Sequence, residues 1–357
     1  MEIVDTTEQA AELERPPLLV RKPLERFLDA QGLGSGPVEA ERIGEGHSNV
    51  TYLVRRGDDR MVLRRPPRPP LPPSAHDVLR EARLLSALEG TEARTPRVLA
   101  TCDDEDVLGG APFYVMEEAR GSVITSDVPE ALDVPEHRHA LGMELVDALA
   151  EIHAVDWTAA GLEGFGKPTG YLERQLRRFN GLWDHNKTRE LPVVSEVGQW
   201  LADNLPESGP STIVHGDYRL GNVMVGEDPP ARVVSVFDWE LATIGDPLAD
   251  VGYLTITWAQ SDDPEDLAFG ALSAATRREG FPTRDQLVAR YEERSGRSVQ
   301  SLAWYQALAI WKAAVFMEGN YKAYAEGRSD DEYLALFDEG VPALAAQAKQ
   351  IAETGSR

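Results

Sequence analysis

Cysteine is almost absent from this sequence, since Cys102 is the only one among 357 residues. A single cysteine excludes a disulfide within the chain and favours a reducing compartment. No apolar run approaches the roughly 18 residues that a membrane-spanning helix needs. The acidic start, MEIVDTTEQAAELERPP, lacks the apolar core of a signal peptide. These absences predict a cytoplasmic protein that does not enter a membrane.

Basic residues are also scarce. The 36 lysines and arginines face 60 acidic residues, which gives a formal net charge of −24. Such a charge repels a phosphate backbone and argues against nucleic-acid binding, and it favours a cationic substrate over an anionic one. The main exception is RMVLRRPPRPP, in which four arginines indicate an anion site: Arg60, Arg64, Arg65 and Arg68. For Arg60 and Arg68, a solvated turn with ion pairs is the alternative.

The length of the chain favours two lobes, because a single hydrophobic core stops growing beyond roughly 250–300 residues. We expect an N-terminal extension with a short helix at residues 1–37, a first lobe at 38–119 and a second lobe at 120–357. Within the extension, residues 1 to about 20 are expected to be disordered, and Lys22–Gln31 has the spacing of an amphipathic helix.

Apolar spacing predicts three longer helices. Ala75–Leu88 and His137–His153 each carry apolar residues on one side, and His153 is interpreted as structural. The third helix lies in the segment 301–327, where Trp304 and Trp311 are in helical register. We interpret these tryptophans as core residues rather than as a ligand cage.

Two neighbouring segments, IVHGDYRLGNVMV and VVSVFDWELATIGDP, carry the most informative pattern. Their apolar runs at 213–214, 223–225 and 233–237 predict short strands, and Asp217, Asn222 and Asp238 lie at the ends of these runs. Any one of these acids could instead cap a turn through its own backbone. The joint pattern suits a site for phosphoryl transfer.

Phosphoryl transfer needs metal ions on the phosphates and a carboxylate that orients and deprotonates the attacking hydroxyl. Asn222 and Asp238 offer the oxygen ligands that Mg²⁺ takes in proteins. Asp217 precedes Asn222 by the spacing of the protein-kinase catalytic loop, D-x-x-x-x-N, with Gly216 where those enzymes carry arginine. We therefore expect Asp217 to be the catalytic base.

A glycine-containing loop and a basic strand precede this segment. Gly44 and Gly46 would let backbone N–H groups approach phosphate oxygens, with Ser48 as a hydroxyl donor, although a plain hairpin turn is the alternative. Alignment of MVLR with the kinase VAIK strand makes Arg64 the phosphate-binding residue, ahead of Arg65.

The next two candidates concern the partner of Arg64 and the nucleotide base. Glu81 on the following helix is expected to fix Arg64, and an ordinary surface glutamate is the alternative. The segment Met116–Ala119 would contact adenine through backbone groups of Glu117 and Ala119.

From about Ile43 to Tyr253 these elements follow one another in kinase order, and the chain resembles the aminoglycoside phosphotransferase-like family of small-molecule kinases. HGDYRLGN and FDWELATIGDPLADVG carry the resemblance. They look most like bacterial phosphotransferases related to the kinase domain fused to acyl-CoA dehydrogenases. Asp246 and Asp250 resemble a structural element that braces the catalytic loop.

The resemblance implies an α+β, bilobal protein-kinase-like fold with a small β-rich N-lobe and a larger, mainly helical C-lobe. It implies ATP and Mg²⁺, a nucleotide-binding first lobe, and a second lobe that binds substrate and carries Asp217 as base. The residue Arg64 departs from the lysine of the family.

Three functions follow as hypotheses. The first is an ATP- and Mg²⁺-dependent O-phosphotransferase acting on a small molecule with a hydroxyl group, either an aminoglycoside or a metabolite such as a hydroxyacyl-CoA. The others are a catalytically silent nucleotide-binding regulatory module and a phosphate-hydrolysing enzyme. Five residues could line an acceptor site or simply face solvent: Asp262, Asp263, Glu318, Asn320 and Tyr321. The sequence leaves the oligomeric state open.

Overall fold

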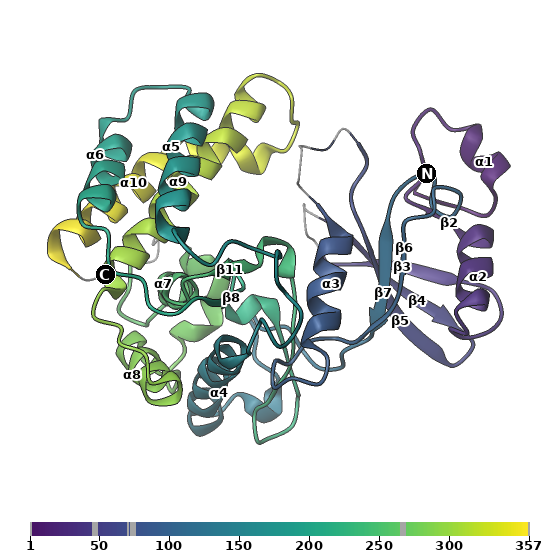
Figure 1. The fold of residues 1–357 in the computed structure, drawn as a ribbon, viewed down its shortest axis with the longest axis horizontal. Helices are drawn as coiled ribbons and strands as arrows, with labels where there is room; N and C mark the ends of the chain where they lie inside the picture. Colours follow the sequence, from purple (N-terminus) through teal and green to yellow (C-terminus); the bar gives the residue numbers. More distant parts are fainter. Residues whose placement is uncertain (1, 45–48, 70, 72–75, 265–268, 356–357) are drawn as a thin grey trace. The chain divides into compact units, whose positions relative to one another are not determined.

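The structure is a computed structural model that describes residues 2–44, 49–69, 71, 76–264 and 269–355. The chain divides into two compact units. The first holds the residues through Arg120 together with Ser235–Glu240, and the second holds Gly121–Val234 and Leu241–Arg357. Figure 1 shows the strand-rich first unit and the mainly helical second unit.

The first unit is built on a five-stranded antiparallel sheet (Figure 1). In spatial order its strands are β3 (Glu39–Ile43), β4 (Val50–Arg56), β5 (Asp59–Arg65), β7 (Phe113–Glu117) and β6 (Val98–Cys102). Successive side chains of a strand point to opposite faces of the sheet. Phe113 therefore packs edge-on against Phe27 of α2 (Arg21–Ala30), with ring centroids 5.2 Å apart, while the buried Tyr114 interacts with Glu81 of α3 (Val78–Leu88).

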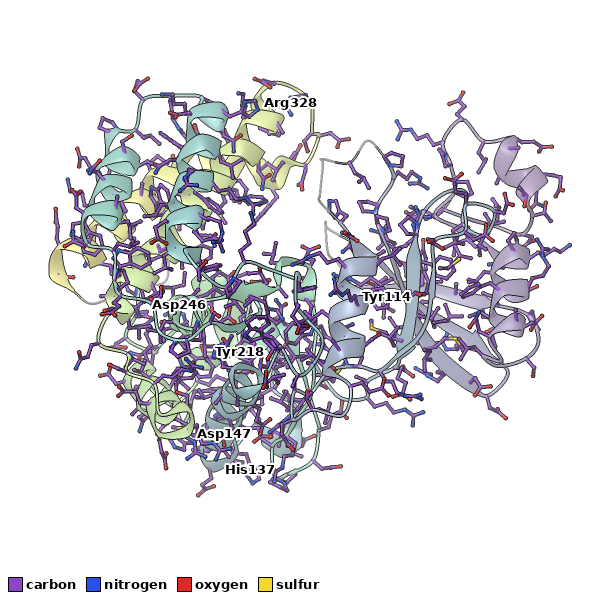
Figure 2. The ribbon with its side chains drawn as sticks, in the orientation of Figure 1. Tyr114, His137, Asp147, Tyr218, Asp246 and Arg328 are labelled. Carbon is purple, nitrogen blue, oxygen red and sulfur yellow. The ribbon has the colours of Figure 1, made fainter. Side chains whose placement is uncertain are left out.

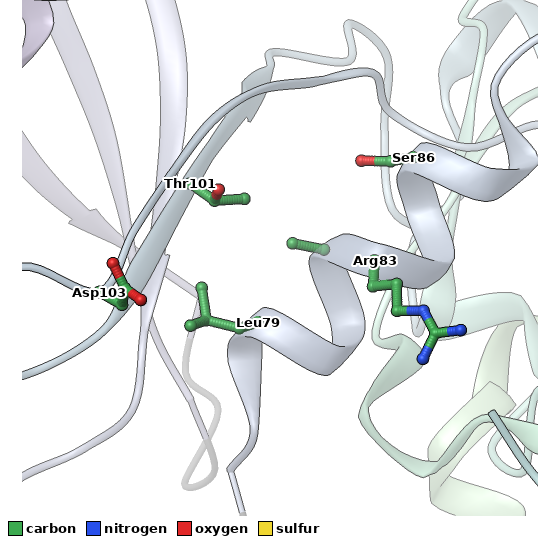
Figure 3. A pocket seen from close by; sticks show the side chains of 6 residues that line it. Leu79, Arg83, Ser86, Thr101 and Asp103 are labelled. Atoms are coloured by element: carbon green, nitrogen blue, oxygen red, sulfur yellow. The ribbon is translucent and has the colours of Figure 1, made fainter. Parts of the chain in front are cut away.

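The helix expected at Ala75–Leu88 from its apolar stripe is present as α3, which begins at Val78; Ala75 lies outside the described residues. Asp77 caps its first turn by accepting a hydrogen bond from the Arg80 N–H at 2.9 Å. The stripe is buried and consists of Val78, Ala82, Leu85 and Leu88. On another side, α3 and β6 border a groove (Figure 3) lined by Leu79, Ala82, Arg83, Ser86, Thr101 and Asp103. No predicted site residue lines this groove.

The expected disorder of the first 20 residues is wrong. The segment forms β1 (Ile3–Val4), α1 (Thr7–Ala11) and β2 (Leu19–Val20), and β1 pairs with β2 in parallel. Leu18 and Leu19 are buried in the same apolar cluster as the sheet. This burial stabilises a segment whose composition alone suggested disorder. The helix expected at Lys22–Gln31 is present as α2.

The second unit is organised around α9 (Leu302–Ala325), which packs against four other helices. Trp304 and Trp311 are buried on it, so their interpretation as core residues is confirmed. The other helices are α4 (Pro135–Ala154), α5 (Tyr171–Asn186), α6 (Pro192–Asp203), α7 (Leu248–Thr257), α8 (Arg284–Ser295) and α10 (Phe337–Thr354). No helix in the described part of the chain is both long and apolar enough to span a membrane.

Two short strand pairs frame the segment that carries the predicted catalytic residues. β8 (Thr212–Val214) pairs antiparallel with β11 (Thr243–Gly245), and β9 (Val223–Val225) pairs with β10 (Val233–Val236). The three strands expected from the apolar runs are therefore present. Short 3₁₀ turns complete the chain at Glu130–Leu132, Leu220–Asn222, Trp239–Leu241, Gly270–Arg277 and Glu332–Leu336.

Candidate active site

Asp217 and Asn222 lie together in the loop between β8 and β9. The Asn222 side-chain amide donates from Nδ2 to Asp217 Oδ2 at 2.7 Å and to the Asp217 carbonyl at 2.8 Å. Asn222 is buried, whereas the Asp217 side chain keeps 21% of its surface exposed. The loop thus fixes the orientation of a carboxylate that is still accessible to a reactant.

Gly216 explains why this loop departs from the kinase pattern. Its φ of +90° lies in the left-handed region, where a side chain is strained. A Cβ at this position would lie 2.9 Å from Leu241 Cβ and 3.1 Å from the Leu241 carbonyl oxygen. The arginine that protein kinases carry here would not fit.

Asp250, in the first turn of α7, holds the start of the loop. It is fully buried and accepts the His215 N–H at Oδ2 (2.7 Å) and the Gly216 N–H at Oδ1 (2.8 Å). His153 Nε2 lies 3.2 Å from Oδ2, and its Nδ1 lies 2.7 Å from the Tyr291 hydroxyl, which supports a structural role for His153. Burial alone would raise the pKa of Asp250, but His153, His215 and the Gly216 N–H lower it below its usual value.

Asp246 holds the turn between β11 and α7. Its carboxylate accepts the Tyr305 hydroxyl at 2.8 Å and the Leu248 N–H at 3.0 Å. Figure 2 labels Asp246 and also Tyr218, whose buried hydroxyl donates to the Leu145 carbonyl at 2.7 Å. These contacts fit the bracing element that the family resemblance implied.

Arg219 is a residue that the sequence interpretation missed. Its Nε lies 3.6 Å from Asp217 Oδ1, and 19% of its side-chain surface is exposed. A basic residue two positions after the candidate base, in a chain this acidic, was the signal available in the sequence. Its charge can stabilise the negative charge of a phosphoryl group beside Asp217.

In the first unit, Arg64 brings together two acidic residues that are distant in the sequence. Its Nε donates to Glu81 Oε2 at 2.9 Å, and its Nη2 donates to Asp238 Oδ1 at 2.5 Å. The Glu81 side chain is 2% exposed and the Arg64 side chain 13%. The expected Arg64–Glu81 ion pair is therefore present.

The position of Asp238 is also fixed through its backbone. Its φ of +62° is uncommon for a residue other than glycine. The next residue, Trp239, donates its N–H to Glu81 Oε1 at 3.2 Å. Glu81 therefore supports Arg64 with one oxygen and the Asp238 turn with the other.

The pKa values of Arg64 and Glu81 each depend on the other's charge and on the charge of Asp238. Burial raises the pKa of Glu81 to about 7, and the carboxylates of Asp238 and Glu240 add to the rise while Arg64 opposes it. Burial would lower the pKa of Arg64, but Glu81, Tyr114, Asp238 and Glu240 together raise it. Arg64 therefore remains a cation, and the carboxylates of both Glu81 and Asp238 interact with its charge.

The remaining basic residues of the β5 segment have other partners. Arg65 is buried on the opposite face and donates to the Leu18 carbonyl at 2.5 Å. Arg60 pairs with Glu118, with Nε 2.6 Å from Oε2, and Arg68 donates to the Pro16 carbonyl at 2.7 Å. Arg64 is the arginine of this segment for which a contact with predicted site residues within the described part of the chain is established, and the ion-pair alternative is correct for Arg60.

The predicted nucleotide loop and adenine contacts are described only in part. Gly44 has a φ of +77°, while Gly46 and Ser48 lie outside the described residues. The Glu117 side chain pairs with Arg97, and its N–H donates to the Arg97 carbonyl at 2.9 Å. Ala119 follows β7 directly after Glu118. These contacts leave the adenine assignment as a prediction.

Comparison with known proteins identifies the family. Residues 39–287 match the phosphotransferase enzyme family. The chain is 33% identical over 312 residues to acyl-CoA dehydrogenase family member 10 of Mus musculus, covering 86% of this chain and 28% of that protein. It is 31% identical to acyl-CoA dehydrogenase family member 11 of Gallus gallus, covering 89% of this chain and 41% of that protein. The chain thus spans well under half of these relatives.

Solved structures show the same fold. A "putative aminoglycoside phosphotransferase" from Ralstonia eutropha is 29% identical, with a TM-score of 0.77 over 93% of this chain and 98% of the other. The aminoglycoside phosphotransferase APH(4)-Ia, solved with AMP-PNP and hygromycin B, is 18% identical, with a TM-score of 0.59 over 94% of this chain and 99% of the other.

The family match and the structural likeness confirm the expected α+β, bilobal kinase-like fold, with its β-rich first unit and helical second unit. They also confirm the resemblance to phosphotransferases related to the domain fused to acyl-CoA dehydrogenases. The chain belongs to the phosphotransferase enzyme family of small-molecule kinases.

Proposed function

We propose that this chain is an ATP- and Mg²⁺-dependent O-phosphotransferase that transfers the γ-phosphate to a hydroxyl group of a small molecule. The observation that carries the proposal is the Asp217–Asn222 pair, joined at 2.7 Å in a loop that the buried Asp250 holds. Family membership adds support, because small-molecule kinases use such a loop for phosphoryl transfer.

Asp217 acts as the general base. Its carboxylate accepts the proton of the acceptor hydroxyl as that oxygen forms a bond to the γ-phosphorus, and the bond from phosphorus to the ADP oxygen breaks. The amide of Asn222 restrains one carboxylate oxygen, and Arg219 lies 3.6 Å from the other. This arrangement orients the base before the acceptor binds.

The residues available for Mg²⁺ have the right chemistry. Asn222 uses its Nδ2 on Asp217, so its side-chain carbonyl oxygen is the group it can offer to a cation. Asp238 keeps 33% of its side-chain surface exposed beside Arg64. Carboxylate and amide oxygens suit Mg²⁺, which, when bound, neutralises charge on the phosphates.

The nucleotide-binding role falls to the first unit. Arg64 is a permanent cation fixed by Glu81, and a guanidinium held in this way binds phosphate oxygens well. The proposal extends to the remaining residues predicted to contact the nucleotide, which are Gly44, Gly46, Ser48, Glu81, Glu117 and Ala119.

The experiment is a transfer assay with [γ-³²P]ATP and Mg²⁺ against aminoglycosides, hydroxyacyl-CoAs, sugars and amino alcohols. We expect one acceptor class to be labelled by the wild type, and Asp217→Asn to lower turnover by about a hundredfold or more, as loss of a general base does. Asp228→Asn, an exposed residue in the loop after β9, is the matched control and should be unaffected. ATP binding without labelling of any acceptor would favour the regulatory module instead.

A further inference from the structure

The packed helices α5 and α9 of the second unit carry two cations that lack acidic partners. The Arg178 guanidinium carbon lies 5.9 Å from the centre of the Phe179 ring, and Lys312 Nζ lies 4.9 Å from the same centre. With the residues that the structure describes, neither cation forms an ion pair or a hydrogen bond. Two positive charges therefore lie close to the ring of Phe179.

The two cations lie in a chain with a net charge of −24. Several other arginines of the second unit pair with carboxylates, among them Arg189 with Glu318, Arg284 with Asp263, and Arg290 with Asp147. Arg178 is exposed and Lys312 is half-buried, so Lys312 is the cation of the two that loses more of its hydration.

The charged form of Lys312 is disfavoured by its surroundings. Burial first, and then the charge of Arg178, lower its pKa to about 8, while Asp250 opposes the shift. A cation near an aromatic ring gains roughly 0.5–2 kcal/mol from the ring, which compensates for only part of the lost hydration. An anion bound near both side chains would offset more of this loss.

The helix α9, which carries Lys312, packs against both α5, which carries Arg178, and α7, which carries Asp250. Asp250, whose charge opposes the lowering of the Lys312 pKa, accepts the N–H groups of His215 and Gly216. Asp250 and Arg178 both act on the pKa of the buried Tyr171 hydroxyl, which burial raises above its usual value. An anion bound by Arg178 and Lys312 would therefore lie beside α9, which packs with α7, whose Asp250 holds the loop that carries Asp217.

We infer that Arg178, Phe179 and Lys312 form a subsite for an anionic group, a phosphate or a carboxylate, of the acceptor molecule. This inference rests on the proposed function. The guanidinium offers two parallel donors, the ammonium offers a point charge, and the ring covers an apolar part of the ligand.

Two of the acidic residues considered for the acceptor site, Glu318 and Asp263, have partners within the second unit. Glu318 is fully buried and accepts from the Thr188 N–H at 2.9 Å, and it also pairs with Arg189. Asp263 pairs with Arg284 and accepts the Gln260 N–H at 2.7 Å. Both carboxylates therefore already have partners inside the second unit.

The first test measures anion binding without turnover. Acylation of Lys312 at pH 8 is followed by peptide mass spectrometry, with Lys349 as the internal reference, while inorganic phosphate or acetate is added at constant ionic strength. We expect the anion to protect Lys312, and Arg178→Gln to raise the concentration needed by roughly tenfold, as loss of one charged hydrogen bond does. Arg177→Gln, the same change at an exposed neighbour, should have no effect. Equal acylation with and without both anions would overturn the subsite.

The second test uses kinetics with a hydroxy acid, its CoA thioester and its neutral amide as acceptors. We expect Lys312→Met to raise KM for the anionic acceptors roughly tenfold with kcat and the KM for ATP nearly unchanged, and Lys312→Arg to recover most of the loss. An unchanged ATP KM shows that the variant is folded.

Transfer to an acceptor whose KM does not respond to Lys312→Met overturns the inference and leaves the proposed function intact. Protection of Lys312 without transfer to any acceptor overturns both the proposed function and the assignment of the anion to an acceptor.

Discussion

Arg64 donates from Nη2 to Asp238 Oδ1 at 2.5 Å, and this contact ties β5 to the segment that follows β10. Glu81 takes part from the other side, through Arg64 Nε and the Trp239 N–H. The residue proposed to bind phosphate thus also positions a residue proposed to bind the metal. Arginine, at a position where kinases carry lysine, suits this arrangement because its planar guanidinium presents separate N–H donors to the two carboxylates.

Replacement of Arg64 tests this arrangement. Arg64→Ala leaves Glu81 buried without its cation, so we expect a loss of about 3 kcal/mol in the free energy of unfolding and a higher KM for ATP. Arg64→Lys should recover part of the stability but less of the ATP affinity, because an ammonium cannot form two parallel hydrogen bonds. Urea unfolding and ATP kinetics provide the measurements. An unchanged KM in both variants would remove Arg64 from nucleotide binding.

Asp238→Ala separates metal binding from the integrity of the first unit. Glu81 and Arg64 remain paired in this variant, so we expect the unfolding free energy to change by less than about 1 kcal/mol, because Asp238 is partly exposed. Calorimetry should show that Mg²⁺-dependent ATP binding is lost. Asp58→Ala, at an exposed turn of the same unit, is the control. Wild-type affinity in Asp238→Ala would contradict its assignment as a metal ligand.

The sequence predicted several local contacts of the candidate site. The spacing of Asp217 and Asn222 already implied a pair on one loop, and strand alternation separated Arg64 from Arg65. These relationships depend on neighbours within a few residues.

The predictions that failed, and the residues that were missed, depend on distant contacts. Leu18 and Leu19 are ordered because β2 pairs with β1 and packs against the sheet, which local composition does not reveal. Arg178 and Lys312 come from helices far apart in the sequence and meet only at the Phe179 ring. A single sequence gives no sign of such a meeting.

Gly216→Ala tests whether the catalytic loop requires its left-handed backbone. The added Cβ would be 2.9 Å from Leu241 Cβ at a φ of +90°, so we expect a destabilisation of roughly 1–3 kcal/mol and a lower kcat. Gly226→Ala is the matched control, since a Cβ there would meet only ordinary contacts of 3.7 Å or more. If both variants unfold and turn over like the wild type, the loop tolerates a side chain at position 216 and the steric argument is wrong.

Asp250→Asn tests the buried brace and its pH dependence. The folded-state pKa of Asp250 lies below the ordinary value of 3.8, so its ionised form stabilises the fold above about pH 4, and this contribution is lost as the pH falls through the folded pKa. An asparagine accepts one of the two backbone N–H groups and places its own amide against the other, so we expect a loss of about 3 kcal/mol near neutral pH.

The difference in unfolding free energy between wild type and Asp250→Asn should therefore be constant from pH 7 to about 5 and should shrink below pH 4. Urea titrations at several pH values, followed by tryptophan fluorescence, measure this difference. Asp228→Asn, whose side chain is exposed, should show no such convergence. A difference that grows as the pH falls would mean that the folded protein raises the pKa of Asp250, and that burial outweighs the three donors that contact its carboxylate.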